Sequence, residues 1–339
     1  MIRTADIFIR HGLEYLKLYG ERMLPSHLKA MRDILLCRKR PLGGQTFFCK
    51  DCQKIHYSYH SCGSRSCPHC QNDRTTKWLE NQNRLLLPVT YFMATVTLPA
   101  LLRNMAKTHQ KKIYHLFFQT SAEALLTLAK DKRFVGGMIG FLGVLQTWRR
   151  DLLYHLHIHY LIPGIGISDD QKKVYRSKPD FLMHAKPLAI IFKAKFRDAL
   201  KKAGLYEQVP QKVWKQEWVI DIKPVGNGEA VLKYLAPYIF RVAISEKNIL
   251  KLRDGRVTFR YQDSDTKETR ISTLDAIQFI SRFFQHVLPR GFVKVRYYGF
   301  LHPKRKMVLE KVKELLGYLF SPKKTNHHSK TKKHCTLKW

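Results

Sequence analysis

Residues 154–162 read Tyr-His-Leu-His-Ile-His-Tyr-Leu-Ile, and this regular alternation predicts a β-strand. Side chains of a strand point alternately to the two faces of a sheet, so His155, His157 and His159 would share one face. Neighbouring imidazoles on one face can bind a single metal ion. An alternating row of histidines can equally line a polar sheet face, and the strand by itself leaves both interpretations open.

The segments around this strand predict further strands and helices in no strict β-α-β order. Strands are predicted at 90–98, 140–145, 217–222, 257–262 and 269–273. Helices are predicted at 74–87, 111–130, 181–203, 229–240 and 274–287. This mixture is typical of an α+β fold in which a central antiparallel sheet is flanked by helices.

The predicted helix 229–240 carries two tyrosines, Tyr234 and Tyr238. Side chains four residues apart lie on the same helix face, one turn from each other. A phenol with a pKa of about 10 is a weak nucleophile unless its target is activated, as a divalent cation does for a phosphodiester. Ordinary packing of the helix is the alternative explanation for this pair.

Six of the seven cysteines lie between Cys37 and Cys70. Two pairs, Cys49-x-x-Cys52 and Cys67-x-x-Cys70, predict one tetrahedral Zn²⁺ site, and four thiolates would make it structural because no coordination position stays open. Four further residues nearby either form a second zinc site or are ordinary packed and exposed side chains; they are His27, Cys37, His60 and Cys62.

The chain of 339 residues is strongly basic, with 61 Lys and Arg against 26 Asp and Glu and a formal net charge of +35. The natural partner of such a charge is a polyanion, so we expect the protein to bind nucleic acid. Since 45% of its residues are hydrophobic, it is not a disordered basic tail. No secretory signal is visible at residues 1–10, which predicts a cytoplasmic protein.

Several short motifs follow one another in a characteristic order. They are Leu42-Gly43-Gly44, Ser61-Cys62, Cys67-Pro68-x-Cys70, residues 91–99 and 155–163, Tyr234-Leu-Ala-Pro-Tyr238, Arg241-Val-Ala-Ile-Ser245, His286-Val-Leu-Pro-Arg-Gly291 and Tyr298-Gly299. With these motifs the chain resembles, over nearly its whole length, the two-tyrosine HUH transposases of the IS91 family of rolling-circle insertion sequences. Gln45 and Ser66 stand where many relatives have His, so neither ligates zinc as a His would.

The resemblance implies a division of the chain. A zinc-binding DNA-recognition domain would occupy 1–85, an HUH nuclease domain 86–320, and a disordered basic tail 321–339. Within the nuclease domain the tyrosine helix would span 229–241 and a C-terminal subdomain 246–320. The protein would act with the bacterial nucleoid, on single-stranded transposon ends and target DNA.

The resemblance also implies a mechanism. His157 and His159 would bind a catalytic Mg²⁺ or Mn²⁺, and Tyr234 and Tyr238 would form 5′-phosphotyrosine links with single-stranded DNA. A third metal ligand is expected, and the candidates are His155, Asp221 and Glu229. Basic residues near the two sites are candidates for DNA contacts, although solvated surface is the common role of such residues; they are Arg65, Lys223 and Arg241.

Two other functions fit the same residues. The first is a plasmid replication initiator or relaxase of the HUH class, which shares the chemistry and differs in genetic context. The second is a zinc-dependent DNA-binding protein without catalysis, in which the histidines and tyrosines are structural.

Overall fold

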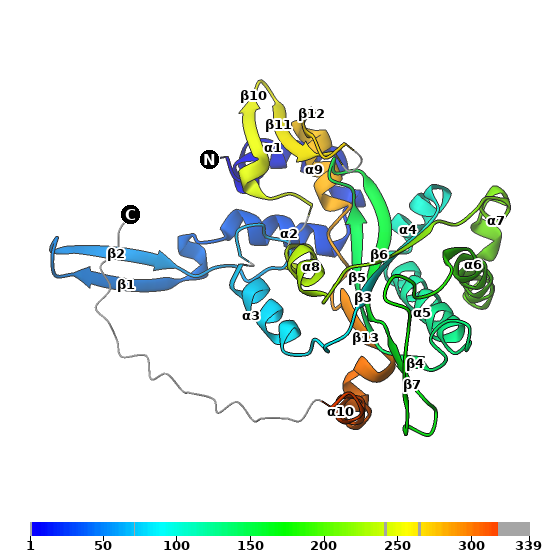
Figure 1. The fold of residues 1–339 in the computed structure, drawn as a ribbon. Helices are drawn as coiled ribbons and strands as arrows, with labels where there is room; N and C mark the ends of the chain where they lie inside the picture. The colour runs from blue at the N-terminus through cyan, green and yellow to red at the C-terminus, as the bar shows by residue number, and fades with distance from the viewer. Residues whose placement is uncertain (1, 71, 241–242, 264–265, 318–339) are drawn as a thin grey trace.

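The computed structural model describes residues 2–70, 72–240, 243–263 and 266–317 (Figure 1). The predicted tail 321–339 and Arg241 lie outside the described residues, as does the side chain of Tyr238.

The centre of the molecule is a five-stranded, wholly antiparallel sheet, which confirms the predicted fold class. Its strands lie in the order β13 (Val295–Tyr298), β5 (Phe141–Trp148), β6 (Tyr154–Pro163), β3 (Tyr91–Thr97) and β9 (Ile220–Pro224). Nearly every residue of β5 and β6 is buried, because helices cover both faces of the sheet. The histidine strand β6 is therefore the middle strand of the sheet.

Two pairs of helices cover the two faces. On one face lie α5 (Gln110–Ala129) and α6 (Ala185–Lys202), whose Phe117 and Phe192 join Ile158 of β6 in the largest apolar core. On the other face lie α8 (Glu229–Phe240), which has the predicted bounds, and α3 (Asn72–Asn83). Leu232 and Leu235 of α8 pack on Val144 of the sheet. This packing brings the tyrosine helix onto the face that carries His157 and His159.

The N-terminal helices share one core with elements from the later part of the chain. The N-terminal helices α1 (Thr4–Tyr19) and α2 (Pro25–Leu36) pack with α9 (Ala276–Phe284) and with the sheet β10 (Ile249–Arg253), β11 (Arg256–Gln262) and β12 (Thr269–Asp275). The ring of Phe8 lies 5.4 Å from that of Phe283 and 5.5 Å from that of Phe284. This core thus joins residues from both sides of the boundary predicted at residue 85.

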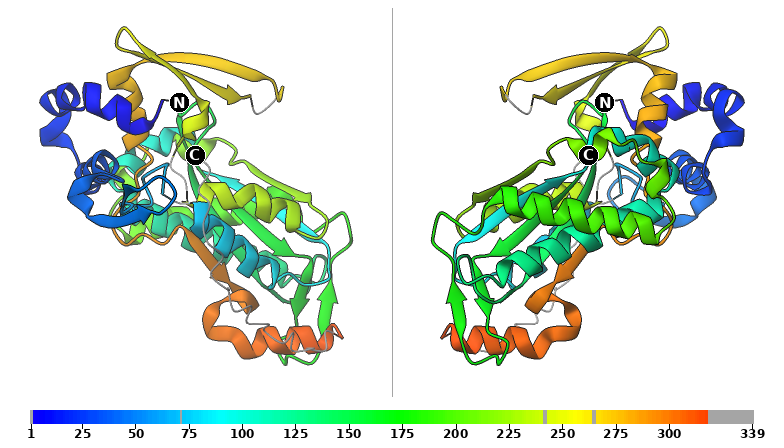
Figure 2. Two further views of the ribbon diagram at one scale, coloured as in Figure 1. Left: turned by 90° about the vertical axis from the view of Figure 1, so that its left-hand side faces the viewer. Right: turned by 90° about the vertical axis from the view of Figure 1, so that its right-hand side faces the viewer.

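The remaining elements lie at the edges of the molecule. The hairpin β1 (Gly44–Cys49) and β2 (Lys54–Tyr59) projects from the body (Figure 1). The β10–β12 sheet crosses one end of the molecule, and α10 (Lys306–Leu315) lies at the opposite end near a small sheet of β4 (Met138–Ile139), β7 (Ile165–Ile167) and β8 (Val174–Arg176) (Figure 2). Two short helices complete the fold, α4 (Arg103–Thr108) and α7 (Lys212–Lys215). Within the described ranges no helix has the length and apolar character that crossing a membrane requires.

Candidate active site and metal centres

The register of the central sheet surrounds the two histidines with polar side chains. On one side His159 pairs with Thr95 of β3 and His157 with Thr97. On the other side His157 pairs with Gln146 of β5. Because paired residues of neighbouring strands share a face, these side chains form one polar patch beneath α8.

His157 and His159 are buried, and their ring centroids lie 4.9 Å apart. His159 Nδ1 lies 2.9 Å from Thr95 Oγ1, and His157 Nδ1 donates to the carbonyl oxygen of His155 at 3.0 Å. A histidine whose Nδ1–H is bound in this way presents the lone pair of Nε2 to a metal. His159 Nε2 is buried with no hydrogen-bond partner among the described residues. A metal ion bound at this nitrogen would satisfy it.

His157 Nε2 lies 3.0 Å from Oε1 of Gln146. This contact is favourable when a proton or a cation lies between the two atoms, or when the amide turns its nitrogen toward the ring. Gln146 is 3% exposed, so its side-chain amide is held at the site. Sequence reasoning missed Gln146 and Thr95, since no motif marks them and only the strand register brings them to the histidines.

Burial keeps the site histidines neutral. It lowers the pKa of His157 well below the ordinary value and lowers the pKa of His159 to about 4, and the nearby charge of Lys223 adds to the effect on His159. Burial also lowers the pKa of His155. A neutral imidazole is the form that binds a metal, so the site is ready for a cation at neutral pH.

The three predicted candidates for a third metal ligand, His155, Asp221 and Glu229, lie at different distances from the site. Of the His, Cys, Asp and Glu ligand atoms in the described part of the chain, no set of three within 4.8 Å of one another includes His157 or His159. Asp221 of β9 pairs with Thr95 of β3. Its Oδ2 lies 3.2 Å from Nζ of Lys223, which is predicted to contact DNA. Glu229 is the first residue of α8. The ring centroid of His155 lies 5.0 Å from that of His157. Gln146, 3.0 Å from His157 Nε2, joins them as a candidate for the third ligand.

Tyr234 faces this polar patch from α8. Its ring centroid lies 6.1 Å from that of His159, and it is 37% exposed, so a substrate in solvent can reach it. The turn before α8 depends on Gly228, which has a φ of 84° and would place a Cβ 3.0 Å from the ring of Tyr91. Tyr238 lies one turn further along α8.

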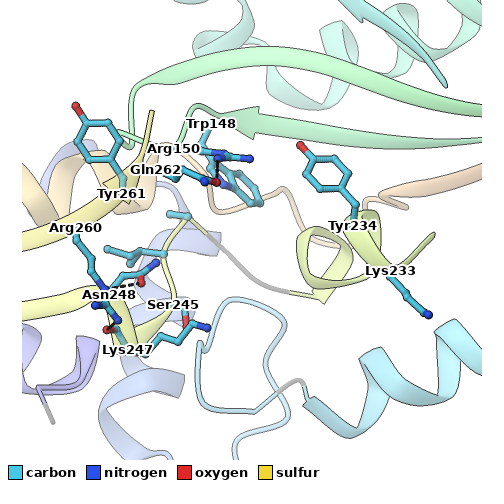
Figure 3. A pocket seen from close by; sticks show the side chains of 12 residues that line it. Trp148, Arg150, Lys233, Tyr234, Ser245, Lys247, Asn248, Arg260, Tyr261 and Gln262 are labelled. Carbon is cyan, nitrogen blue, oxygen red and sulfur yellow. Dashed lines mark hydrogen bonds between the residues drawn. The ribbon is translucent and has the colours of Figure 1, made fainter. Parts of the chain in front are cut away.

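Two adjoining clefts meet at Tyr234. One, of about 380 Å³, contains the three histidines of β6 and Gln146. The other, of about 410 Å³, is shown in Figure 3 and contains Lys233, Lys247 and Arg260. The clefts share five lining residues, namely Trp148, Arg150, Tyr234, Tyr261 and Gln262. Together they make one groove with aromatic and cationic walls, a composition typical of single-strand nucleic-acid sites.

Arg65 has a structural role that differs from its predicted role in DNA binding. Its guanidinium donates to the carbonyl oxygens of Phe292 at 2.5 Å and Pro289 at 2.6 Å. These bonds fasten the cysteine-rich segment to the chain that leads into β13. Two nitrogens of the guanidinium are therefore engaged by backbone carbonyls, and the predicted DNA contact of Arg65 stays a prediction.

The structure corrects the predicted pairing of the cysteines. Cys37, Cys62, Cys67 and Cys70 form one group, with all four Sγ atoms within 4.8 Å of one another. Cys70 Sγ lies 3.2 Å from Cys37 Sγ and 3.5 Å from Cys62 Sγ. An ion about 2.3 Å from each sulfur sets tetrahedral sulfur separations of about 3.8 Å, so the group fits Zn²⁺.

The other predicted zinc ligands lie elsewhere. Cys49 and Cys52 form a separate group with His56, because the β1–β2 hairpin carries them away from Cys67 and Cys70. His27 stacks on Phe284 at 5.4 Å. Neither His27 nor His60 belongs to a group of ligands among the described residues.

Comparisons with known proteins identify transposases as relatives of this chain. Residues 7–98 match the family model described as "Transposase zinc-binding domain", and residues 140–307 match the one described as "Putative transposase". The chain is 35% identical over 335 residues to "Putative transposase y4qJ" of Sinorhizobium fredii, covering 93% of this chain and 84% of that protein. It is 25% identical over 300 residues to "Transposase for insertion sequence element IS801" of Pseudomonas savastanoi pv. phaseolicola, covering 81% of this chain and 70% of that protein.

No solved structure matches the chain. The relatives are transposases rather than replication initiators or relaxases, and the matched domains cover both the cysteine-rich segment and the histidine–tyrosine cleft. The chain therefore belongs to the IS91 family of transposases and contains that family's zinc-binding domain.

Proposed function

We propose that this transposase cleaves and rejoins single-stranded DNA through a 5′-phosphotyrosine intermediate, in rolling-circle-type transposition of an insertion sequence. One observation carries the proposal: an exposed tyrosine, Tyr234, lies beside a buried histidine, His159, whose Nε2 has no partner among the described residues. A nucleophile next to a ready metal ligand is the arrangement that phosphodiester cleavage needs.

His157 Nε2, His159 Nε2 and Gln146 Oε1 would hold the catalytic Mg²⁺ or Mn²⁺. The ion, when bound, would polarise the scissile phosphate as a Lewis acid. Thr95 and the carbonyl of His155 fix the two imidazole rings, so the donors need little rearrangement.

The tyrosine performs the transfer. Tyr234 Oη would form a bond to phosphorus, and the bond between phosphorus and O3′ of the preceding nucleotide would break. The phenol loses one proton, and the leaving 3′ oxygen gains one to become a hydroxyl. Tyr238, one helical turn away, would make a second link while the first persists. Two tyrosines one helical turn apart would therefore allow strand exchange without release of the DNA.

The groove beside Tyr234 would hold the DNA strand. Arg150, Lys247 and Arg260 supply cations for phosphates, and the ring of Tyr261 offers a surface for base stacking. Lys223 and Arg241 would add phosphate contacts, as would the basic tail without sequence preference. We propose that these charges also hold the protein on the DNA of the bacterial nucleoid.

The cysteine group Cys37, Cys62, Cys67 and Cys70 would hold a structural Zn²⁺. Cys67 is 2% exposed and belongs to the core shared by the N-terminal helices and α9. A metal there would order the segment that Arg65 fastens to the body. The zinc-binding domain would then recognise transposon ends from a fixed position.

A suicide oligonucleotide tests the catalytic proposal. The wild-type protein should form a denaturation-resistant adduct with single-stranded DNA of the transposon end, only with Mg²⁺ or Mn²⁺ present. The double variant Tyr234→Phe/Tyr238→Phe should form no adduct and still bind the oligonucleotide, whereas Tyr261→Phe should keep adduct formation. An adduct that persists in the double variant would overturn the assignment of the tyrosines.

A further inference from the structure

The β1–β2 hairpin has no hydrophobic core of its own. No residue of either strand is buried, and its large apolar side chains Phe47, Phe48, Ile55 and Tyr57 are between 52% and 64% exposed. The hairpin projects from the body in Figure 1. An isolated two-stranded hairpin is marginally stable in water, so its far end needs stabilisation from another source.

Three metal-binding side chains lie together at that far end. The last pair of the ladder is Cys49 and Lys54, and residues 50–53 form the turn. Cys49 and His56 share a face of the hairpin as diagonal neighbours, and Cys52 belongs to the turn itself. The ligand atoms of these three residues lie within 4.8 Å of one another, and Cys52 Sγ lies 3.3 Å from His56 Nε2.

The donor set identifies the metal. Two thiolates and one imidazole are soft and borderline donors of the kind that bind Zn²⁺ in tetrahedral geometry. Ideal bond lengths place a sulfur and a nitrogen ligand about 3.5 Å apart, close to the separation of Cys52 and His56. The turn is already closed without metal, since Gln53 has a φ of 53° and its side chain donates to the Lys50 carbonyl at 2.7 Å. The ligands are therefore prearranged.

This group is separate from the four-cysteine group. A strand of six residues, the length of β1, spans about 17 Å, and Cys62 and its partners lie beyond the base of the hairpin. The four-cysteine group supplies all four ligands of a closed site. Among the described residues the hairpin group has three, with no fourth His, Cys, Asp or Glu within reach.

We propose that the hairpin end is a second zinc site, formed by Cys49 Sγ, Cys52 Sγ and His56 Nε2 with water in the fourth position. The ion replaces the missing core and holds the turn at the exposed end of the hairpin. Its exposure and open position make it exchangeable, whereas the ion of the four-cysteine group is retained.

Zinc content measured by elemental analysis tests the proposal on the full chain. The wild-type protein should contain two zinc ions, and a weak chelator should remove one of them quickly. His56→Ala and Cys52→Ser should each contain one ion. His60→Ala is the matched control, because His60 adjoins the same hairpin and belongs to neither group, and it should keep two.

Limited proteolysis provides a readout independent of metal counting. Cleavage within residues 44–59 should slow on the order of 100-fold when free Zn²⁺ exceeds its dissociation constant 100-fold, and His56→Ala should lose this protection. The proposal would be overturned if His56→Ala and Cys52→Ser each contained two zinc ions. It would also be overturned if the wild-type protein contained one ion and both variants retained it. If the wild-type protein contained one ion, Cys62→Ser lost it and the two hairpin variants kept it, the four-cysteine group alone would bind zinc and the proposal would be overturned.

Discussion

The rings of Tyr234 and His159 meet edge to face, with centroids 6.1 Å apart and planes at 82°. The two residues come from different layers of the fold, the helix α8 and the strand β6. Packing of Leu232 and Leu235 on the sheet sets their separation, so the proposed nucleophile is positioned by the apolar core beneath it. Two predictions concern this site and its groove, and two concern contacts of Arg65 and His286 elsewhere in the fold.

Gln146 should contribute to metal binding. Gln146→Ala removes the amide oxygen beside His157 and should weaken Mn²⁺ binding about 10–100-fold, with a matching shift in the metal dependence of adduct formation. Titration of adduct yield against Mn²⁺ measures the effect. Gln278→Ala, at an exposed glutamine of α9, is the control; equal metal dependence in both variants would argue against the Gln146 ligand.

The groove should account for part of the salt dependence of DNA binding. Each phosphate contact on a single strand contributes about 0.7 to the slope of log affinity against log salt. Lys247→Ala/Arg260→Ala should therefore lower the slope by about 1.4 for a single-stranded oligonucleotide. Lys130→Ala/Lys132→Ala removes the same charge outside the groove, and a slope reduced equally by this control would show that general charge decides binding.

Arg65 should stabilise the fold and leave DNA binding unchanged. Arg65→Ala deprives the carbonyls of Pro289 and Phe292 of charged donors and should lower the free energy of unfolding by about 2–4 kcal/mol. Urea denaturation measures this loss. Arg290→Ala, an exposed arginine of the same segment, should have little effect on stability. If Arg65→Ala kept its stability and bound DNA more weakly, the result would support the prediction from the sequence that Arg65 contacts DNA.

His286 should make the protein sensitive to acid. Its Nε2–H donates to the Leu152 carbonyl at 3.1 Å, its Nδ1 lies 3.3 Å from the Thr147 hydroxyl, and burial lowers its pKa from 6.5 to about 3. Between these pH values the unfolded chain binds a proton that the folded chain does not, so stability falls as pH falls. The slope from this group is about 1.4 kcal/mol per pH unit.

Urea denaturation between pH 4 and 6 measures the His286 contribution. Burial also lowers the pKa of other histidines, among them His27, His157 and His159, and these act in the same direction. The comparison is therefore between the slopes of stability against pH in different variants. His286→Gln should reduce the slope by about 1.4 kcal/mol per pH unit, and the exposed control His184→Gln should not. Identical slopes in the two variants would contradict the assignment of acid sensitivity to His286.

Local patterns predicted much of the fold. The alternation around His157 and the 3.6-residue periodicity of 229–240 are properties of consecutive residues, and the strand and helix appear where these patterns predict them. The N-terminal helices were not predicted, and neither was their packing on α9. That contact joins residues 4–36 to residues 276–284, segments far apart in the sequence, and no periodicity within either segment encodes it.

The sequence by itself determined the family, the shared face of the two histidines and the one-turn spacing of the two tyrosines, because each depends on spacing along one segment. Only the tertiary structure decided which cysteines lie together, that Gln146 and Thr95 adjoin the histidines, and that Arg65 binds backbone carbonyls. These are contacts between separate segments. They depend on strand register and on where a hairpin projects, and the packing of the whole chain sets both.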